Sequence, residues 1–263
     1  MSAGVPTLYA QYYEAQFVSG GSVFGDLSNL WDYELEVKKK RYWVHPDDNE
    51  RTGLVVHGMD IAKKKDFTVI YSVNTIGKLV GFVRTRHLPY PSQAQLLKTY
   101  LNKYFFNSEN NIRYDGTGVG EAFGDILNDM DLNGIVEQVI FSNKSKAEML
   151  TKTLLAIQTG WHKAPFIPVV NHEFSTYEVT VSKFGNHQYS APDGEHDDVV
   201  SAAMLALSEA YYAEKNDQAF ELLEKHFTDG PTNEEIMEAY SQDDEFFTDQ
   251  DDEEDFTEDL DEM

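Results

Sequence analysis

The stretch LVVHGMD (residues 54–60) is a short apolar run that ends in an acid, and the fold is built outward from it. The runs FTVIYSV (67–73) and KLVGFV (78–83) follow, with turn residues in the gaps. Runs of this length and composition predict β-strands, and the short gaps predict an antiparallel meander. Residues 92–106 have the apolar spacing of a helix, and NIRY (111–114) predicts a fourth strand.

Strands and helices alternate further along the chain. Residues 121–130 and 145–158 predict helices, and residues 136–141 between them predict a fifth strand. The order β-β-β-α-β-α-β-α predicts an α/β fold with a mixed five-stranded sheet flanked by helices, which is the order of the ribonuclease H-like fold. Residues 177–190 contain two alternating runs split by a Gly-Asn pair, which predict an extra β-hairpin, and residues 199–212 predict a buried helix.

Charge is distributed unevenly along the 263 residues. The 46 acidic and 21 basic side chains give a formal net charge of −25. Between Asp229 and Met263 there are 17 acids and no Lys or Arg, so that segment carries −17 and the rest of the chain only −8. The overall balance disfavours a simple basic clamp for nucleic acid. Residues 214–263 are interpreted as a largely disordered acidic tail, with docking to a basic partner or mimicry of DNA as functional alternatives.

Composition also excludes several classes of site. The absence of cysteine excludes structural disulfides, thiolate zinc sites and thiol catalysis. No run reaches the roughly 18 apolar residues of a membrane-spanning helix, and the N-terminus lacks a signal-peptide pattern. We therefore expect a soluble intracellular protein with no membrane partner.

Acids stand at three places where a core is expected. Asp60 ends the first strand, Asp115 ends the fourth, and Asp197 and Asp198 begin an otherwise apolar helix. If the first and fourth strands are neighbours, their ends point to one spot, and the helix can bring its acids there. Carboxylates gathered beside a core repel one another unless a cation binds them, and Mg²⁺ and Mn²⁺ prefer oxygen ligands. Two such ions about 4 Å apart can support phosphodiester hydrolysis.

Each of these signals also has a simpler interpretation. A lone Asp at a strand end is most often a turn former, and the glycine-rich stretch after Asp115 is most often only a turn. Acids at a helix start complement the helix dipole. The joint placement of the acids on the expected elements, in the expected order, favours the metal site.

Three segments resemble the acidic motifs of a known family. They are GMDIAKKKDFTV (58–69), YDGTGVGEA (114–122) and EHDDVVSA (195–202), and they resemble motifs of the nuclease domain of tailed-bacteriophage terminase large subunits. The resemblance covers about residues 52–212. Residues 12–24 resemble the segment that follows the ATPase domain in such proteins. It implies a ribonuclease H-like, metal-dependent endonuclease that cuts concatemeric double-stranded viral DNA when packaging starts and ends.

The resemblance implies roles for individual residues. Asp60, Asp115 and Asp198 are the implied catalytic metal ligands for two Mg²⁺ or Mn²⁺ ions, and Asp197 is a second candidate for the position of Asp198. His196 is a candidate for orienting a ligand or a water, although a histidine at a helix start is more often structural.

Lysines near the motifs are candidates for contacts with DNA phosphates. One set lies in the turn after the first strand and another lies near the 145–158 helix: Lys63, Lys64, Lys65, Lys144 and Lys146. The simpler interpretation of each is a solvated surface lysine.

The chain departs from the family because it has no G-x-x-x-x-G-K-[ST] phosphate loop. We therefore expect no ATP hydrolysis by this chain alone, and interpret residues 1–50 as a linker after a missing ATPase domain and 51–213 as the nuclease domain. The chain is then an excised domain or, as its initiating Met and long tail favour, half of a split terminase. Implied partners are double-stranded DNA, a packaging ATPase, the small terminase subunit and the portal protein, in a motor of the host cytoplasm that is not a stable virion component.

Two other functions are compatible with the sequence. One is a different ribonuclease H-like nuclease, such as a junction resolvase. The other is a non-catalytic acidic interaction protein that keeps the fold as a scaffold, against which the presence of all three acid motifs argues.

Overall fold

The structure is a computed structural model, and it describes residues 22–37, 41–62, 66–118, 121–181 and 187–214. All of them belong to the first of two structural units, which ends at Lys215. The predicted acidic tail beyond Glu214 lies outside the described residues. None of the described helices combines the length and apolarity that crossing a bilayer requires.

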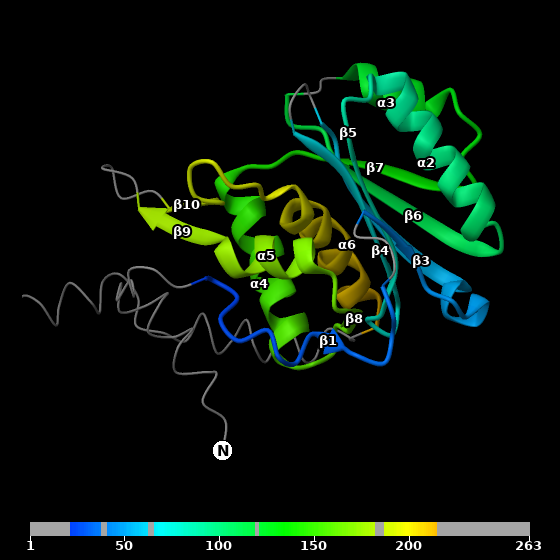
Figure 1. Ribbon diagram of the computed structural model, residues 1–263. Coiled ribbons are helices and arrows are strands. Elements are labelled where there is room, and N and C mark those ends of the chain that lie inside the picture. Colours follow the sequence, from blue (N-terminus) through cyan, green and yellow to red (C-terminus); the bar gives the residue numbers. More distant parts are fainter. Residues whose placement is uncertain (1–21, 38–40, 63–65, 119–120, 182–186, 215–263) are drawn as a thin grey trace, which may run out of the picture. The chain divides into compact units, whose positions relative to one another are not determined.

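A mixed sheet of six strands forms the centre of the fold, in the order β2-β5-β4-β3-β6-β7 (Figure 1). Strands β3, β4 and β5 form the predicted antiparallel meander, while β6 lies parallel to β3 and β7 lies parallel to β6. The first and fourth predicted strands are therefore neighbours, which a shared acidic site at their ends requires. The strands are β2 (Tyr42–Val44), β3 (Gly53–Asp60), β4 (Phe67–Asn74), β5 (Leu79–Arg86), β6 (Ser108–Asp115) and β7 (Gly134–Val139).

Helices cover both faces of this sheet (Figure 1). Helix α6 crosses one face with α4 and α5 beside it, and α2 and α3 cover the other, so that each face buries its own apolar cluster. The helices are α2 (Tyr90–Tyr104), α3 (Glu121–Asn128), α4 (Asn143–Gln158), α5 (Pro168–Thr176) and α6 (Asp198–Glu214), with a 3-10 turn η1 (Asp48–Arg51). The predicted hairpin is present as β9 (Glu178–Val181) and β10 (His187–Ser190), and β1 (Trp31–Asp32) pairs in parallel with β8 (Ala164–Pro165).

The α/β, ribonuclease H-like architecture is confirmed, but the sheet has six strands where the sequence predicted five. The additional strand is β2, in which Trp43 lies opposite Phe82 of β5. Its three residues sit in a very polar stretch and are too few to show a periodic pattern, so the sequence placed them in a linker. Phe24 and Leu30, from the same predicted linker, are buried in the core. The domain boundaries themselves stay a prediction.

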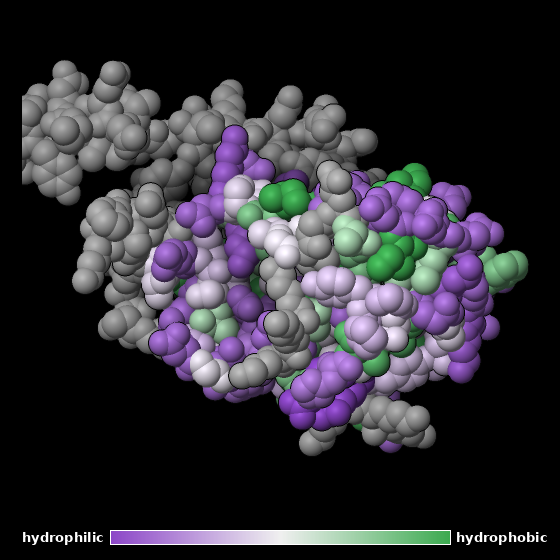
Figure 2. Space-filling view, turned by 90° about the horizontal axis from the view of Figure 1, so that it is seen from above, coloured by the Kyte–Doolittle hydropathy of each residue, from purple (hydrophilic) through white to green (hydrophobic). Residues whose placement is uncertain are grey.

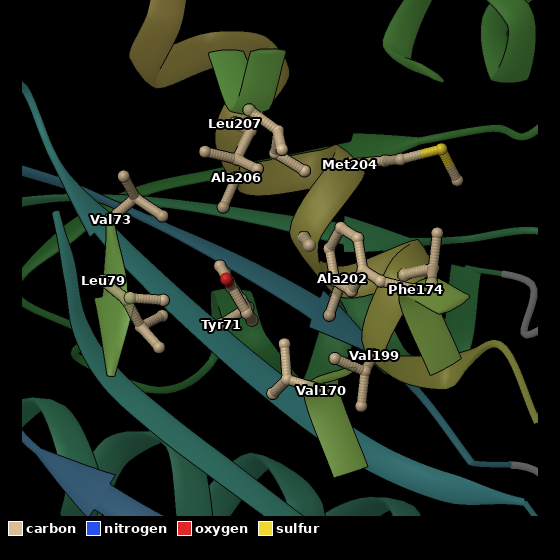
Figure 3. Close-up of a cluster of buried hydrophobic side chains, with 14 of the residues drawn as sticks. Tyr71, Val73, Leu79, Val170, Phe174, Val199, Ala202, Met204, Ala206 and Leu207 are labelled. Atoms are coloured by element: carbon tan, nitrogen blue, oxygen red, sulfur yellow. The ribbon is translucent and has the colours of Figure 1, made fainter. Parts of the chain in front are cut away.

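Helix α6 owes its place on the sheet to small and apolar residues. Figure 3 shows Val199, Ala202 and Ala206 of this helix among side chains from β4 and α5. A Cβ on Gly58 of β3 would lie 1.9 Å from the carbonyl oxygen of Ala202 and 2.7 Å from the backbone nitrogen of Ala206. The missing side chain at Gly58 therefore lets the helix approach the strand closely and sets where α6 begins relative to the end of β3.

We expect Gly58→Ala to destabilise the protein by about 3 kcal/mol, because the new methyl group meets helix backbone that cannot swing away. Urea unfolding measures this. Gly194→Ala is the matched control: its φ of +90° strains any side chain, but no atom lies within 4 Å of the added Cβ, so we expect a loss of only about 1 kcal/mol. Equal losses in the two variants would contradict the close approach of α6 to β3.

The surface seen from above the view of Figure 1 is predominantly hydrophilic (Figure 2). Hydrophobic residues appear on it as separate small groups among the described residues. This side of the molecule therefore has the character of a solvated surface, on which polar contacts would dominate recognition.

Candidate functional site

The predicted acids converge at one end of the sheet, on the face that α6 covers. Gly58 of β3 lies beneath α6, so Asp60, two residues further on, points to the same face. Arg113 of β6 donates a hydrogen bond of 3.1 Å to a backbone carbonyl of α6, so Asp115 points there as well. Asp198 is the first residue of α6. Three elements that are distant in sequence thus bring their carboxylates to one place.

The electrostatics of Asp60 reflect this convergence. Its pKa is raised well above the ordinary value, first by burial and then by the negative charges of Asp198, Asp115 and Asp197, in that order. The ammonium group of Lys146 acts in the opposite direction. The other three predicted carboxylates therefore all oppose the ionisation of Asp60, and holding the group ionised together is costly without a compensating cation.

Asp198, the first residue of α6, is a buried acid. Its side chain is 9% exposed, and burial raises its pKa to about 6, against a lowering by His196. Oδ2 of Asp198 accepts no hydrogen bond from the described residues, and Nδ1 of His196 lies 3.4 Å away. A buried carboxylate oxygen without a donor fits a bound cation, because such an oxygen is otherwise left unsatisfied.

A further acid joins this group. Among the described residues, one trio has potential ligand atoms that all lie within 4.8 Å of one another, and it consists of Asp66, His196 and Asp198. Asp60 and Asp115 are outside that trio. Asp66 was missed at the sequence level because it follows a lysine run in what looks like a polar turn. The available signal was its place at the start of the second strand, inside the first acidic motif.

The predicted lysines fall into three situations. Lys146 of α4 is partly buried, donates a hydrogen bond of 3.3 Å to the carbonyl of Tyr189, and is close enough to Asp60 to lower its pKa. The side chain of Lys144 is 88% exposed and lies 4.0 Å from Glu148. Lys63, Lys64 and Lys65 lie outside the described residues. A role in binding DNA stays a prediction for all five.

A buried ion pair that the sequence did not suggest supports the start of α6. Glu173 of α5 is 1% exposed, and its Oε1 lies 2.9 Å from Nη2 of Arg84 on β5. Its Oε2 accepts a hydrogen bond of 2.7 Å from the backbone N–H of Val199. Burial raises the pKa of Glu173 to about 7, while Arg84 and the Val199 N–H act against that rise. Glu173 thus ties α5 and β5 to the first turn of α6, next to Asp198.

We expect Glu173→Ala to cost about 3 to 5 kcal/mol of stability, because it leaves the Arg84 guanidinium buried and unpaired. Thermal or urea unfolding measures the loss. Glu148→Ala is the control: its partner Lys144 is exposed, so that change should cost less than about 1 kcal/mol. Equal small effects would mean that the Arg84–Glu173 pair does not hold the helix start.

No protein-family model and no curated protein matches this sequence. Among solved structures, the large terminase nuclease from thermophilic phage G20c with bound cobalt is similar, with a TM-score of 0.63 and 21% identity over 73% of this chain and 98% of that one. Its form with bound magnesium gives 0.62 and 22%, over the same shares of the two chains. The large terminase nuclease domain of Thermus phage P74-26 gives 0.57 and 21%, over 70% of this chain and 93% of that one.

These similarities establish a shared fold. The chain has the architecture of phage large terminase nuclease domains, as the three acidic motifs led us to expect. The large terminase of a further thermophilic bacteriophage is also similar, with a TM-score of 0.52 and 9% identity, but 73% of this chain there covers only 44% of that protein.

Proposed function

We propose that this chain is the nuclease part of a phage large terminase, a metal-dependent endonuclease that cuts concatemeric double-stranded viral DNA during genome packaging. The observation that carries the proposal is the convergence of Asp60, Asp115 and Asp198 at one end of a fold shared with terminase nucleases. A fold alone does not specify an activity. Carboxylates that repel one another favour the binding of cations, and this supports metal-dependent chemistry at the site.

The residues fit divalent cations. Asp60, Asp115 and Asp198 offer carboxylate oxygens, which Mg²⁺ and Mn²⁺ prefer, and Asp66 with His196 adds a second set that also includes Asp198. One carboxylate common to two sets of ligands supports two neighbouring ions. Bound cations in such a site lower the pKa of a water and offset charge on phosphate oxygens.

The protein's own groups prepare this site. His196 packs edge-to-face on Phe67, with ring centroids 5.1 Å apart, which orients its Nδ1 toward Asp198. Glu173 fixes the first turn of α6 and so the direction in which Asp198 points. Lys146 offsets part of the negative charge around Asp60. In this proposal these residues orient the ligands and balance charge, and the carboxylates bind the cations.

The partners also belong to the proposal. Only 44% of the large terminase from the further thermophilic bacteriophage is covered by its match to this chain. This supports an ATPase portion that is carried by another segment or by another chain. We propose on the same ground a small terminase subunit and a portal protein as partners, and the host cytoplasm as the place of the packaging motor. Asp197 remains the alternative to Asp198, since both add to the charge around Asp60.

Plasmid cleavage tests the proposal. We expect the wild-type protein to nick and linearise supercoiled DNA with Mg²⁺ or Mn²⁺, and to be inactive in EDTA. Asp115→Asn should lower the rate by more than about 100-fold, because losing a ligand costs more than the roughly 10- to 100-fold loss typical of residues that only support the ligands. Asp125→Asn, on the exposed surface of α3, is the control and should cut normally.

Cleavage that persists in EDTA, or at the wild-type rate in Asp115→Asn, would overturn the mechanism. A strong preference for four-way junctions over linear duplex would favour a junction resolvase on the same fold. Absence of any metal-dependent cutting would favour the non-catalytic interaction protein.

A further inference from the structure

A row of residues crosses the sheet at the same end as the acids. In the strand register, Asp60 of β3 lies opposite Val69 of β4, and Val69 lies opposite Arg84 of β5. The backbone N–H of Arg84 donates a 2.8 Å hydrogen bond to the carbonyl of Arg41, the residue that precedes β2. Neighbouring strands lie about 4.8 Å apart, so Arg84 is about 10 Å, and Arg41 about 14 Å, from Asp60 along this row.

The arginines share a face with the acids. Residues opposite each other on neighbouring strands point to the same side of a sheet, so Arg41 and Arg84 point to the side that α6 covers. Arg86, two residues after Arg84, points there too: the guanidinium carbons of Arg84 and Arg86 lie 3.3 Å and 5.4 Å from the centre of the Phe67 ring. We call Arg41 and Arg86 the arginine pair.

The arginine pair differs from Arg84 in exposure and in ion pairing. Arg84 is largely buried and bound to Glu173. Arg41 and Arg86 are exposed, and neither takes part in any of the ion pairs found between described residues. Two exposed arginines without an ion pair to any described residue therefore lie on the same face of a body whose overall charge is negative. Such a local excess attracts anions even when the net charge does not.

Phe67 connects the arginine pair to the candidate metal site. The ring of Phe67 contacts His196, whose Nδ1 is 3.4 Å from Asp198, and the guanidinium carbon of Arg86 lies 5.4 Å from the centre of the same ring. Stacking on an aromatic ring restricts a guanidinium group and leaves its N–H donors free for an oxyanion. Phe67 thus links the guanidinium of Arg86 to the side chain that faces Asp198.

We propose that Arg41 and Arg86 bind backbone phosphates of the DNA on the β5 and β2 side of the cleavage site. This proposal rests on the proposed function. It assigns the direction in which the bound duplex extends from the cleavage site, across β5 toward β2. Arg86 lies two residues from Arg84 along β5, which places it about 12 Å from Asp60, while Arg41 lies about 14 Å away. Phosphates follow one another every ~3.4 Å of axis along one strand, so these distances correspond to about three or four nucleotides from the scissile phosphate. A guanidinium group often donates two parallel hydrogen bonds to one phosphate group, and this geometry suits residues that position the DNA backbone.

The test measures duplex binding at several salt concentrations, by fluorescence anisotropy of a labelled DNA in EDTA, so that no cutting occurs. Each lost phosphate contact lowers the slope of log affinity against log salt by about 0.9. We expect Arg86→Gln and Arg41→Gln each to lower the slope by about that amount, and the double variant by about twice as much. Lys103→Gln is the control, since Lys103 is an exposed residue near the end of α2, beside the start of β6.

The outcomes separate the two proposals. Wild-type DNA binding and metal-dependent cleavage, combined with an unchanged slope in the double variant, would overturn the arginine pair and leave the nuclease intact. A slope reduced equally in Lys103→Gln would also overturn it, because the effect would then be general surface charge. A reduced slope in the arginine variants alone supports the phosphate contacts, and it does so even where cleavage is absent and the nuclease proposal fails. Unchanged thermal unfolding of the variants excludes misfolding.

Discussion

Asp60→Asn should lower the rate of plasmid cleavage by about a thousand-fold and, in the same preparation, make the metal-free protein more stable. The rate falls because the amide is a poor cation ligand, and losing about 4 kcal/mol of transition-state stabilisation corresponds to that factor. Stability rises because burial and three neighbouring acids oppose the ionisation of Asp60.

The pH dependence of this gain has a defined sign. Folded Asp60 keeps its proton to a higher pH than the unfolded chain does, so its ionisation costs stability increasingly as the pH rises above about 4. Asn carries no such cost, and the advantage of the variant should therefore grow with pH until the folded pKa is passed. Urea unfolding of both proteins in EDTA at several pH values measures it. A variant that is less stable than wild type at neutral pH would show that Asp60 is a structural residue.

Mn²⁺ should stabilise the wild-type protein at pH 8 and do so much less at pH 5. A ligand that binds only the folded state contributes about 2.7 kcal/mol at one hundred times its dissociation constant. Protons compete for the same carboxylates, and the pKa of Asp198 is about 6. At pH 5 that competition alone weakens binding about tenfold, which removes about 1.4 kcal/mol of the stabilisation.

Two variants make this metal effect specific. Asp198→Asn should abolish most of the stabilisation by Mn²⁺, whereas Asp129→Asn, at an exposed position after α3, should keep it. Thermal unfolding with and without Mn²⁺ gives the shifts. A stabilisation that is independent of pH, or that survives in Asp198→Asn, would place the bound ion elsewhere.

Much of the fold could be predicted because local pattern and tertiary structure agree. The runs that became β3, β4 and β5 are apolar stretches bounded by turns, and the long helices have clear spacing or apolar composition. The sequence did not predict β2 because three residues are too few to show an alternating apolar pattern. The position of β2 is set by its pairing with β5.

The site could be predicted where acids interrupt apolar patterns. Asp60, Asp115 and Asp198 each stand at the boundary of a core element, where a charge is conspicuous. Asp66 and Glu173 lie in polar stretches, where a charge is unremarkable. Their proximity to Asp198 and Val199 follows from how α5 and α6 pack on the sheet, which no local sequence signal records.

Titration calorimetry of Mn²⁺ into the EDTA-treated and dialysed protein, without DNA, tests most directly whether the acids at the ends of β3 and β6 and the start of α6 form a metal centre. We predict saturable binding that approaches two ions per chain in the wild type and is lost in the double variant Asp60→Asn, Asp198→Asn. Binding of the same affinity and stoichiometry in both proteins, or no saturable binding in the wild type, would contradict it.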